Sequence, residues 1–91
     1  MLTPEYLSSF RKSYKNFIRG GRILRDDVEK VVLMIAQGEI LPRNYKDHKL
    51  SGEYEGYREC HIKNDILIIY RIDVSRSLLI MRSIGTHDDF F

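Results

Sequence analysis

Three apolar segments separated by short polar breaks dominate the second half of the chain. Residues 57–63 alternate between apolar and polar side chains, residues 66–72 are nearly all apolar, and residues 78–84 are again rich in apolar side chains. Breaks this short suit antiparallel hairpins. The pattern therefore predicts a three-stranded antiparallel meander, with residues 66–72 as its central strand.

Two stretches with helical spacing precede these strands. Residues 3–5 (Thr-Pro-Glu) are typical of a helix start, with a capping hydroxyl, a proline in the first turn and an acidic side chain after it. Glycines at 20–21 end this helix, and a second begins between residues 23 and 26 and ends near Gly38. The apolar stripes are Leu7, Phe10, Tyr14 and Phe17 or Ile18 in the first helix, and Leu24, Val28, Val31, Val32 and Ile35 in the second. A link of two glycines predicts an antiparallel helix hairpin.

The predicted fold is a single α+β domain over residues 1–91, in which the N-terminal antiparallel helix hairpin packs on a small antiparallel sheet. The first two or three residues are also candidates for an edge strand, which gives the order β-α-α-β-β-β. Residues 38–56 are polar and contain one proline and three glycines, so we expect a loop there.

The composition is typical of a cytoplasmic protein. The longest apolar run, residues 66–70, is far too short to span a membrane. The N-terminal residues lack the basic-then-apolar pattern of an export signal. The one cysteine, Cys60, cannot form an internal disulfide, and we expect a buried strand residue rather than a reactive thiol.

Positive charge is concentrated at the N-terminus. Residues 1–25 carry six cationic side chains and one acidic side chain, whereas residues 26–91 carry nine cationic and twelve acidic ones. A polyanionic partner would be attracted to the first segment. The alternative is a solvated helix face without a partner.

The chain has three histidines, His48, His61 and His87, each in a short segment rich in charged, glycine or aromatic residues. Imidazole titrates near pH ~6.5, so it exchanges protons at cellular pH. If the three converge beside a carboxylate and a cation, they would suit acid–base chemistry at a phosphate. The alternative is three unrelated surface histidines.

One carboxylate is a candidate partner for these imidazoles. Asp65 follows His61 by four residues across a predicted tight turn, so the two side chains would meet if they face the same side. A carboxylate beside an imidazole fixes its tautomer and raises its basicity. The alternative is a hairpin mouth with a neutral surface histidine.

Two aromatic residues, Phe90 and Phe91, end the chain. We expect Phe90 to pack and Phe91 to be exposed. An exposed ring could stack on a nucleic-acid base, an interaction worth about 1–3 kcal/mol per base.

Three motifs, at residues 45–52, 56–70 and 85–91, together resemble the YafQ-type branch of the RelE/ParE toxin superfamily. They read Tyr-Lys-Asp-His-x-Leu-x-Gly, Gly-Tyr-Arg-x-x-His-(x3)-Asp-x-Leu-x-Ile-Tyr and Gly-Thr-His-x-x-Phe-Phe. The resemblance implies a small helix hairpin on an antiparallel sheet and the toxin of a toxin–antitoxin pair. It further implies a ribosome-dependent endoribonuclease that cleaves translated mRNA in the A site without a metal or other cofactor, and that is neutralised by a cognate antitoxin.

The resemblance also implicates particular residues in the site. The catalytic candidates are His48, His61, Asp65 and His87, and the substrate-binding candidates are Phe91, Lys46 and Arg82. Our hypothesis makes His61 or His48 the base, oriented by Asp65, makes His87 the acid, and places Lys46 or Arg82 against the phosphate. The candidates for ribosomal RNA contact are Arg11, Lys12, Lys15 and Arg19.

One position departs from the family pattern. The arginine usually found four residues before the third histidine is replaced by Ser83, and Arg82 stands one residue earlier. A shift of one residue in a strand turns a side chain to the opposite face. Either a β-bulge restores the direction of Arg82, or another cation replaces it, or the phosphate is held less well.

Two other functions are compatible with the residues. A ParE-like toxin would act by binding a protein target instead of cutting RNA. Three histidines and an aspartate could also form a zinc site, although their spacings are wide. For either kind of toxin we expect an acidic antitoxin with a segment that orders on binding, over the histidines or the basic first helix.

Overall fold

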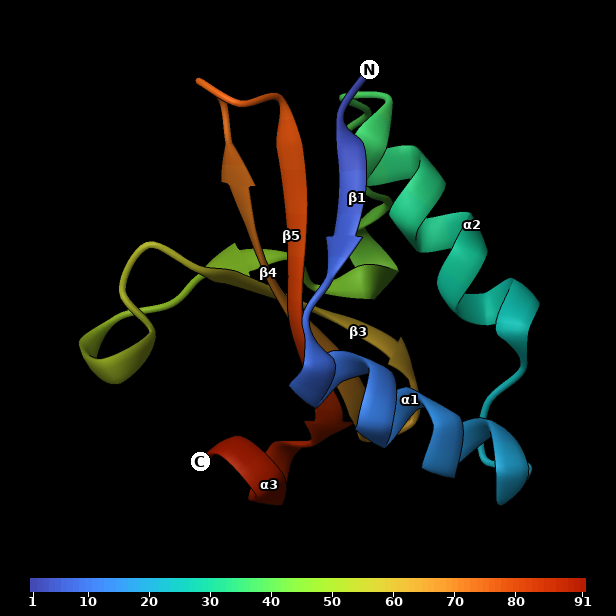
Figure 1. The fold of residues 1–91 in the computed structure, drawn as a ribbon. Coiled ribbons are helices and arrows are strands. Elements are labelled where there is room, and N and C mark those ends of the chain that lie inside the picture. The colour runs from blue at the N-terminus through green and yellow to red at the C-terminus, as the bar shows by residue number, and fades with distance from the viewer.

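The computed structural model describes all 91 residues, and five of its segments form one sheet with the strand order β1-β5-β4-β3-β2 (Figure 1). The strands are β1 (Thr3–Tyr6), β2 (His48–Lys49), β3 (Arg58–Lys63), β4 (Ile66–Asp73) and β5 (Leu78–Thr86). The helices are α1 (Ser8–Arg19), α2 (Arg25–Ala36) and α3 (His87–Phe90), with two 3-10 turns, η1 (Arg43–Tyr45) and η2 (Gly52–Tyr54). The predicted α+β fold and its antiparallel meander of β3, β4 and β5 are confirmed.

The expected helix start at residues 3–5 is wrong, because these residues form strand β1 at the edge of the sheet. β1 runs parallel to β5, with Thr3 beside Leu78 and Tyr6 beside Met81. Pro4 has no N–H to donate, and an edge strand tolerates such a residue. Long-range pairing with β5 therefore prevails over the local capping pattern. The predicted order β-α-α-β-β-β is found with two additions, the short strand β2 and the terminal helix α3, and the sheet is mixed because β1 is parallel.

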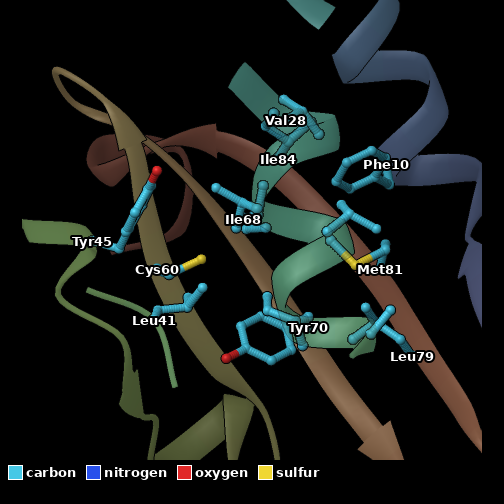
Figure 2. Packing of buried hydrophobic residues seen from close by; sticks show 14 of the residues in the cluster. Phe10, Val28, Leu41, Tyr45, Cys60, Ile68, Tyr70, Leu79, Met81 and Ile84 are labelled. Carbon is cyan, nitrogen blue, oxygen red and sulfur yellow. The ribbon is translucent and has the colours of Figure 1, made fainter. Parts of the chain in front are cut away.

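The two long helices bury their apolar side chains against the sheet, except for Leu24 of the predicted stripe, which precedes α2 and is exposed. α1 contacts mainly β5, whereas α2 contacts β3 and β1. Figure 2 shows Phe10 of α1 and Val28 of α2 directed toward Ile68 and Met81 of the sheet. None of the helices combines the length and the apolar character that crossing a membrane requires.

Cys60 is fully buried in this core, as expected. Burial raises the pKa of its thiol well above the ordinary value. A thiol that stays protonated is a poor nucleophile, so Cys60 serves packing.

The opposite face of the sheet carries the polar side chains of interest. Side chains alternate along a strand, so Glu59 and His61 of β3 lie on the face away from the buried Cys60. The expected loop 38–56 is broken by β2, which pairs with β3 and sets His48 directly opposite Glu59. This pairing brings a residue of the first motif to the strand that carries the second.

Candidate active site

Two histidines share one buried carboxylate. The Nε2 atom of His48 lies 3.3 Å from Oε1 of Glu59, and Nε2 of His61 lies 3.9 Å from the same oxygen. Glu59 is only 4% exposed, and its second oxygen, Oε2, is buried without a hydrogen-bond partner. A buried carboxylate that lacks hydrogen-bond partners lowers the stability of the fold, and an unpaired group of this kind calls for an explanation such as a functional role.

The backbone sets the tautomer of His48. Its Nδ1 atom lies 2.8 Å from the carbonyl oxygen of Lys46, which can only accept a hydrogen bond. The proton must therefore reside on Nδ1, and Nε2 faces Glu59. That nitrogen lies 3.3 Å from Oε1 of Glu59. His48, Glu59 and His61 form one group of side chains, hereafter the Glu59 cluster, of the residue types that general acid–base catalysis uses.

The expected contact between Asp65 and His61 is not made. Asp65 instead pairs with Arg22 of the α1–α2 connection, with 3.4 Å between Oδ1 and Nη2. The physical reason is a register shift in β3, where His61 pairs with Leu67 but Lys63 pairs with Ile66. An extra residue in a strand changes the face on which the following side chains lie. The four-residue spacing from His61 to Asp65 therefore did not place the two side chains on the same side.

Glu59 is the acid that the sequence pattern did not single out. It lies two residues before His61 on the same strand, and side chains at such spacing share a face. That signal was present in the sequence, whereas its proximity to His48 depends on the pairing of β2 with β3.

A β-bulge places Arg82 on the site. In the β4–β5 ladder Ile69 pairs with Ser83 and Tyr70 pairs with Met81, so Arg82 is the additional residue. The hydroxyl of Ser9 in α1 donates a 2.6 Å hydrogen bond to the carbonyl of Arg82, which anchors the bulge. The β-bulge considered as the first explanation for the displaced arginine is therefore present, and its directing of Arg82 toward the phosphate stays a prediction.

The guanidinium of Arg82 lies between two tyrosine rings. Its carbon is 5.1 Å from the ring centre of Tyr54 and 5.1 Å from that of Tyr57. The pKa of the Tyr57 phenol is lowered, chiefly by a hydrogen bond from Arg82 and further by Arg71. The Nε atom of Arg82 is buried without a hydrogen-bond partner.

The C-terminal turn brings His87 and Phe91 to the same aromatic group. The ring of His87 lies 5.1 Å from that of Phe91, which lies 5.9 Å from Tyr54. Phe91 is 54% exposed, whereas Phe90 is half-buried against Tyr54, as expected.

Gly85 makes this turn feasible. A Cβ at Gly85 would lie 2.8 Å from Oδ2 of Asp89 and 3.0 Å from the ring of Phe90, so α3 folds back directly over β5. The start of α3 is capped reciprocally, since the Thr86 amide donates to Asp89 Oδ2 at 2.8 Å and the Asp89 amide donates to Thr86 Oγ1 at 3.3 Å.

The register of the sheet relates the two groups of residues. His61 pairs with Leu67 of β4, and Leu67 pairs with Gly85 of β5. Two strand spacings separate β3 from β5, about 10 Å in total. The Glu59 cluster and the start of α3 therefore lie toward the same end of the sheet, about two strand spacings apart.

The remaining candidates lie outside these contacts. Lys46 supports His48 through its backbone carbonyl, next to the site. The four cationic side chains of α1 expected to contact ribosomal RNA, Arg11, Lys12, Lys15 and Arg19, lie along a helix whose polar side faces away from the core. No set of three or more histidine, cysteine, aspartate or glutamate side chains is grouped so as to hold a metal ion.

Comparison with known proteins shows the family. A model of the YafQ family, bacterial toxins of type II toxin–antitoxin systems, matches residues 2–91. An mRNA interferase toxin YafQ from Escherichia coli strain K12 is 31% identical over 87 residues, which cover 96% of this chain and 92% of that protein. A YafQ-type protein from Haemophilus influenzae is 58% identical over 31 residues, or 34% of this chain and 30% of that protein.

Solved structures agree with this result. A metal-bound toxin from Helicobacter pylori is 35% identical, with a TM-score of 0.93 over 100% of both chains. The E. coli DinJ–YafQ toxin–antitoxin complex contains a chain that is 27% identical, with a TM-score of 0.82 over 99% of this chain and 97% of that one.

Two helices on one face of a five-stranded sheet, with histidines at one end of the other face, define a small toxin with the RelE-like fold. Within that class, the chain belongs to the YafQ family of type II toxin–antitoxin toxins.

Proposed function

We propose that this toxin is an endoribonuclease that cleaves mRNA on the ribosome by acid–base catalysis. The observation that carries the proposal is the Glu59 cluster, in which two imidazoles share a buried carboxylate at the sheet end that also bears His87. The E. coli relative is named an mRNA interferase, which supports the same reaction for this chain.

RNA cleavage of this kind requires three kinds of group. The 2′-oxygen bonds to phosphorus while the bond from phosphorus to the 5′-oxygen breaks, leaving a 2′,3′-cyclic phosphate. A base takes the 2′-hydroxyl proton, an acid protonates the leaving 5′-oxygen, and a cation stabilises the crowded phosphorane. Positioned acid–base groups contribute about 10²–10⁴-fold to such reactions.

The site supplies candidates for each role. His48 or His61, held by Glu59 rather than by Asp65, is the base, and His87 is the acid. Arg82, whose guanidinium lies between Tyr54 and Tyr57, is the proposed phosphate-binding cation, with Lys46 as the alternative. Phe91 offers its exposed ring to a base.

The proposed reaction uses protein side chains alone. One solved neighbour, a toxin from Helicobacter pylori, is metal-bound, so a chelator tests whether this chain needs a metal. We expect full cleavage in excess EDTA, and activity that is lost in the chelator and restored by zinc would contradict this part of the proposal.

An antitoxin and the ribosome are the proposed partners. The E. coli relative is solved with an antitoxin, which supports a cognate antitoxin for this chain. The cations of α1 are proposed to contact ribosomal RNA, and binding should weaken steeply as salt rises.

Mapping of mRNA 5′ ends after induced expression tests the proposal. We expect cuts in reading frame with the wild-type toxin and none with His87→Ala. Asp73→Asn, at the far end of β4, is the matched control and should cut as the wild type does. Toxicity that survives replacement of all three histidines by alanine, without such cuts, would favour a ParE-like toxin that acts by contact.

A further inference from the structure

The carboxylate of Asp47 joins three parts of the chain beside the site. Arg58 of β3 donates to Oδ2 of Asp47 from Nη2 at 2.9 Å and from Nε at 3.2 Å. Tyr70 of β4 donates its hydroxyl to Oδ1 at 2.5 Å. A two-pronged arginine contact fixes orientation as well as distance, so the loop that carries Asp47 is tied to two strands.

Both donors are held firmly. Tyr70 is 2% exposed in the central strand, and Figure 2 shows its ring within the core, near Leu41 and Cys60. Burial and then the hydrogen bond to Asp47 raise the pKa of Tyr70, so its hydroxyl stays a donor. The pKa of Arg58 is raised chiefly by its hydrogen bond to Asp47.

Asp47 lies in the chain between His48 and Lys46, and the carbonyl of Lys46 contacts the His48 ring. Lys46 before it is in the left-handed region, with a φ of 52°, an uncommon conformation for a residue with a side chain. That turn directs the Lys46 carbonyl back to His48 Nδ1. A residue in this conformation persists only when its surroundings hold it, and the bonds to Asp47 supply that constraint.

We propose that Asp47 is a positioning residue, which through Arg58 and Tyr70 holds the Lys46 turn and thereby fixes the tautomer and direction of the His48 imidazole. The importance of this contact for catalysis rests on the proposed function, whereas its effect on the imidazole does not. Asp47 touches no reacting atom, since its oxygens are occupied by Arg58 and Tyr70.

The first experiment measures the imidazole directly. Histidine nitrogen NMR shifts report which ring nitrogen carries the proton in the neutral form. We expect His48 to be protonated at Nδ1 in the wild type and to become a mixture of tautomers in Asp47→Asn. Tyr70→Phe, which removes one hydroxyl, should shift the same equilibrium less. An unchanged Nδ1 tautomer in Asp47→Asn would overturn the proposal, whether or not the toxin cleaves RNA.

The second experiment is a double-mutant cycle on the single-turnover rate of mRNA cleavage. We expect Asp47→Asn to slow cleavage by about 10- to 100-fold, as for a displaced catalytic group. In a His48→Ala background Asp47→Asn should not slow cleavage further, because the imidazole that Asp47 orients is absent. An equal loss in both backgrounds would show a general structural role and overturn the proposal.

Controls separate positioning from folding. Asp73→Asn removes another arginine-paired carboxylate, in the β4–β5 turn, and should leave both readouts unchanged. If Asp47→Asn does not fold, Tyr70→Phe decides the outcome, with Tyr14→Phe in α1 as its control. A wild-type toxin without cleavage would refute the proposed function, and the tautomer measurement would still decide the role of Asp47.

Discussion

Replacement of Gly85 by alanine tests whether the C-terminal turn belongs to the site. The new methyl would lie 2.8 Å from Asp89 Oδ2 and 3.0 Å from the Phe90 ring, closer than carbon atoms tolerate. Gly85 has no left-handed backbone conformation, so alanine brings no backbone strain of its own. The effect of the substitution is therefore confined to the contact between β5 and α3.

The magnitudes indicate that α3 gives way. Its capping box contributes about 1 kcal/mol and each aromatic contact with Tyr54 about 0.5–1.5 kcal/mol. Overpacking costs about 1–3 kcal/mol, and β5 is held between β1 and β4 whereas α3 has four residues. Alanine also stabilises the fold by about 0.4–1 kcal/mol through the unfolded chain. With the overpacking cost of about 1–3 kcal/mol offset by about 0.4–1 kcal/mol, we expect the free energy of unfolding to fall by about 0–2.6 kcal/mol.

The cleavage rate should fall in Gly85→Ala protein that is still folded. A displacement of His87 by about 1 Å can slow the reaction about 100-fold. The assay is single-turnover cleavage of ribosome-bound mRNA, with thermal unfolding followed by circular dichroism on the same samples. If α3 moves in Gly85→Ala but the cleavage rate stays at the wild-type value, the proposed role of this turn in positioning His87 is refuted.

Gly38→Ala is the matched control. Gly38 has a φ of 78°, and no atom lies within 4 Å of the position that a methyl group would take, so alanine adds backbone strain without a clash. It lies after α2, outside the site contacts. We expect lower stability with an unchanged cleavage rate, and a parallel loss in both variants would attribute the effect of Gly85→Ala to stability alone.

Three further changes follow from the geometry. Glu59→Gln should slow single-turnover cleavage at least about 100-fold and more than Asp65→Asn does, while the melting temperature stays level or rises, because a costly buried carboxylate is removed. Arg82→Lys should slow cleavage about tenfold, since an ammonium cannot replace a planar group between two rings; an unchanged rate would contradict the phosphate role. Arg76 lowers the pKa of Asp73 from 3.8 to about 2, so this carboxylate stabilises the fold above pH 3.8 and the benefit is lost as pH falls through 2. The melting temperatures of wild type and Asp73→Asn should therefore differ at pH 5 and converge near pH 2, and a constant difference would contradict this linkage.

The Glu59 cluster shows how far sequence spacing reaches. Glu59 and His61 lie two residues apart on one strand, which is a local relation that alternation reveals. His48 joins them only because a two-residue strand pairs with β3. Such a short strand has no hydrophobic pattern of its own, so its place depends on contacts such as those of Asp47 with Arg58 and Tyr70.

The sequence by itself determined the two helices, the three-stranded meander and the motifs that assign the family, because periodicity and short turns are local properties. The tertiary structure decided the edge strand at residues 3–6, the partner of Asp65 and the direction of Arg82. Each of these depends on pairing between distant segments or on one extra residue in a strand. A bulge reverses the face of every side chain beyond it, and no count of residues along the chain reveals where the ladder will shift.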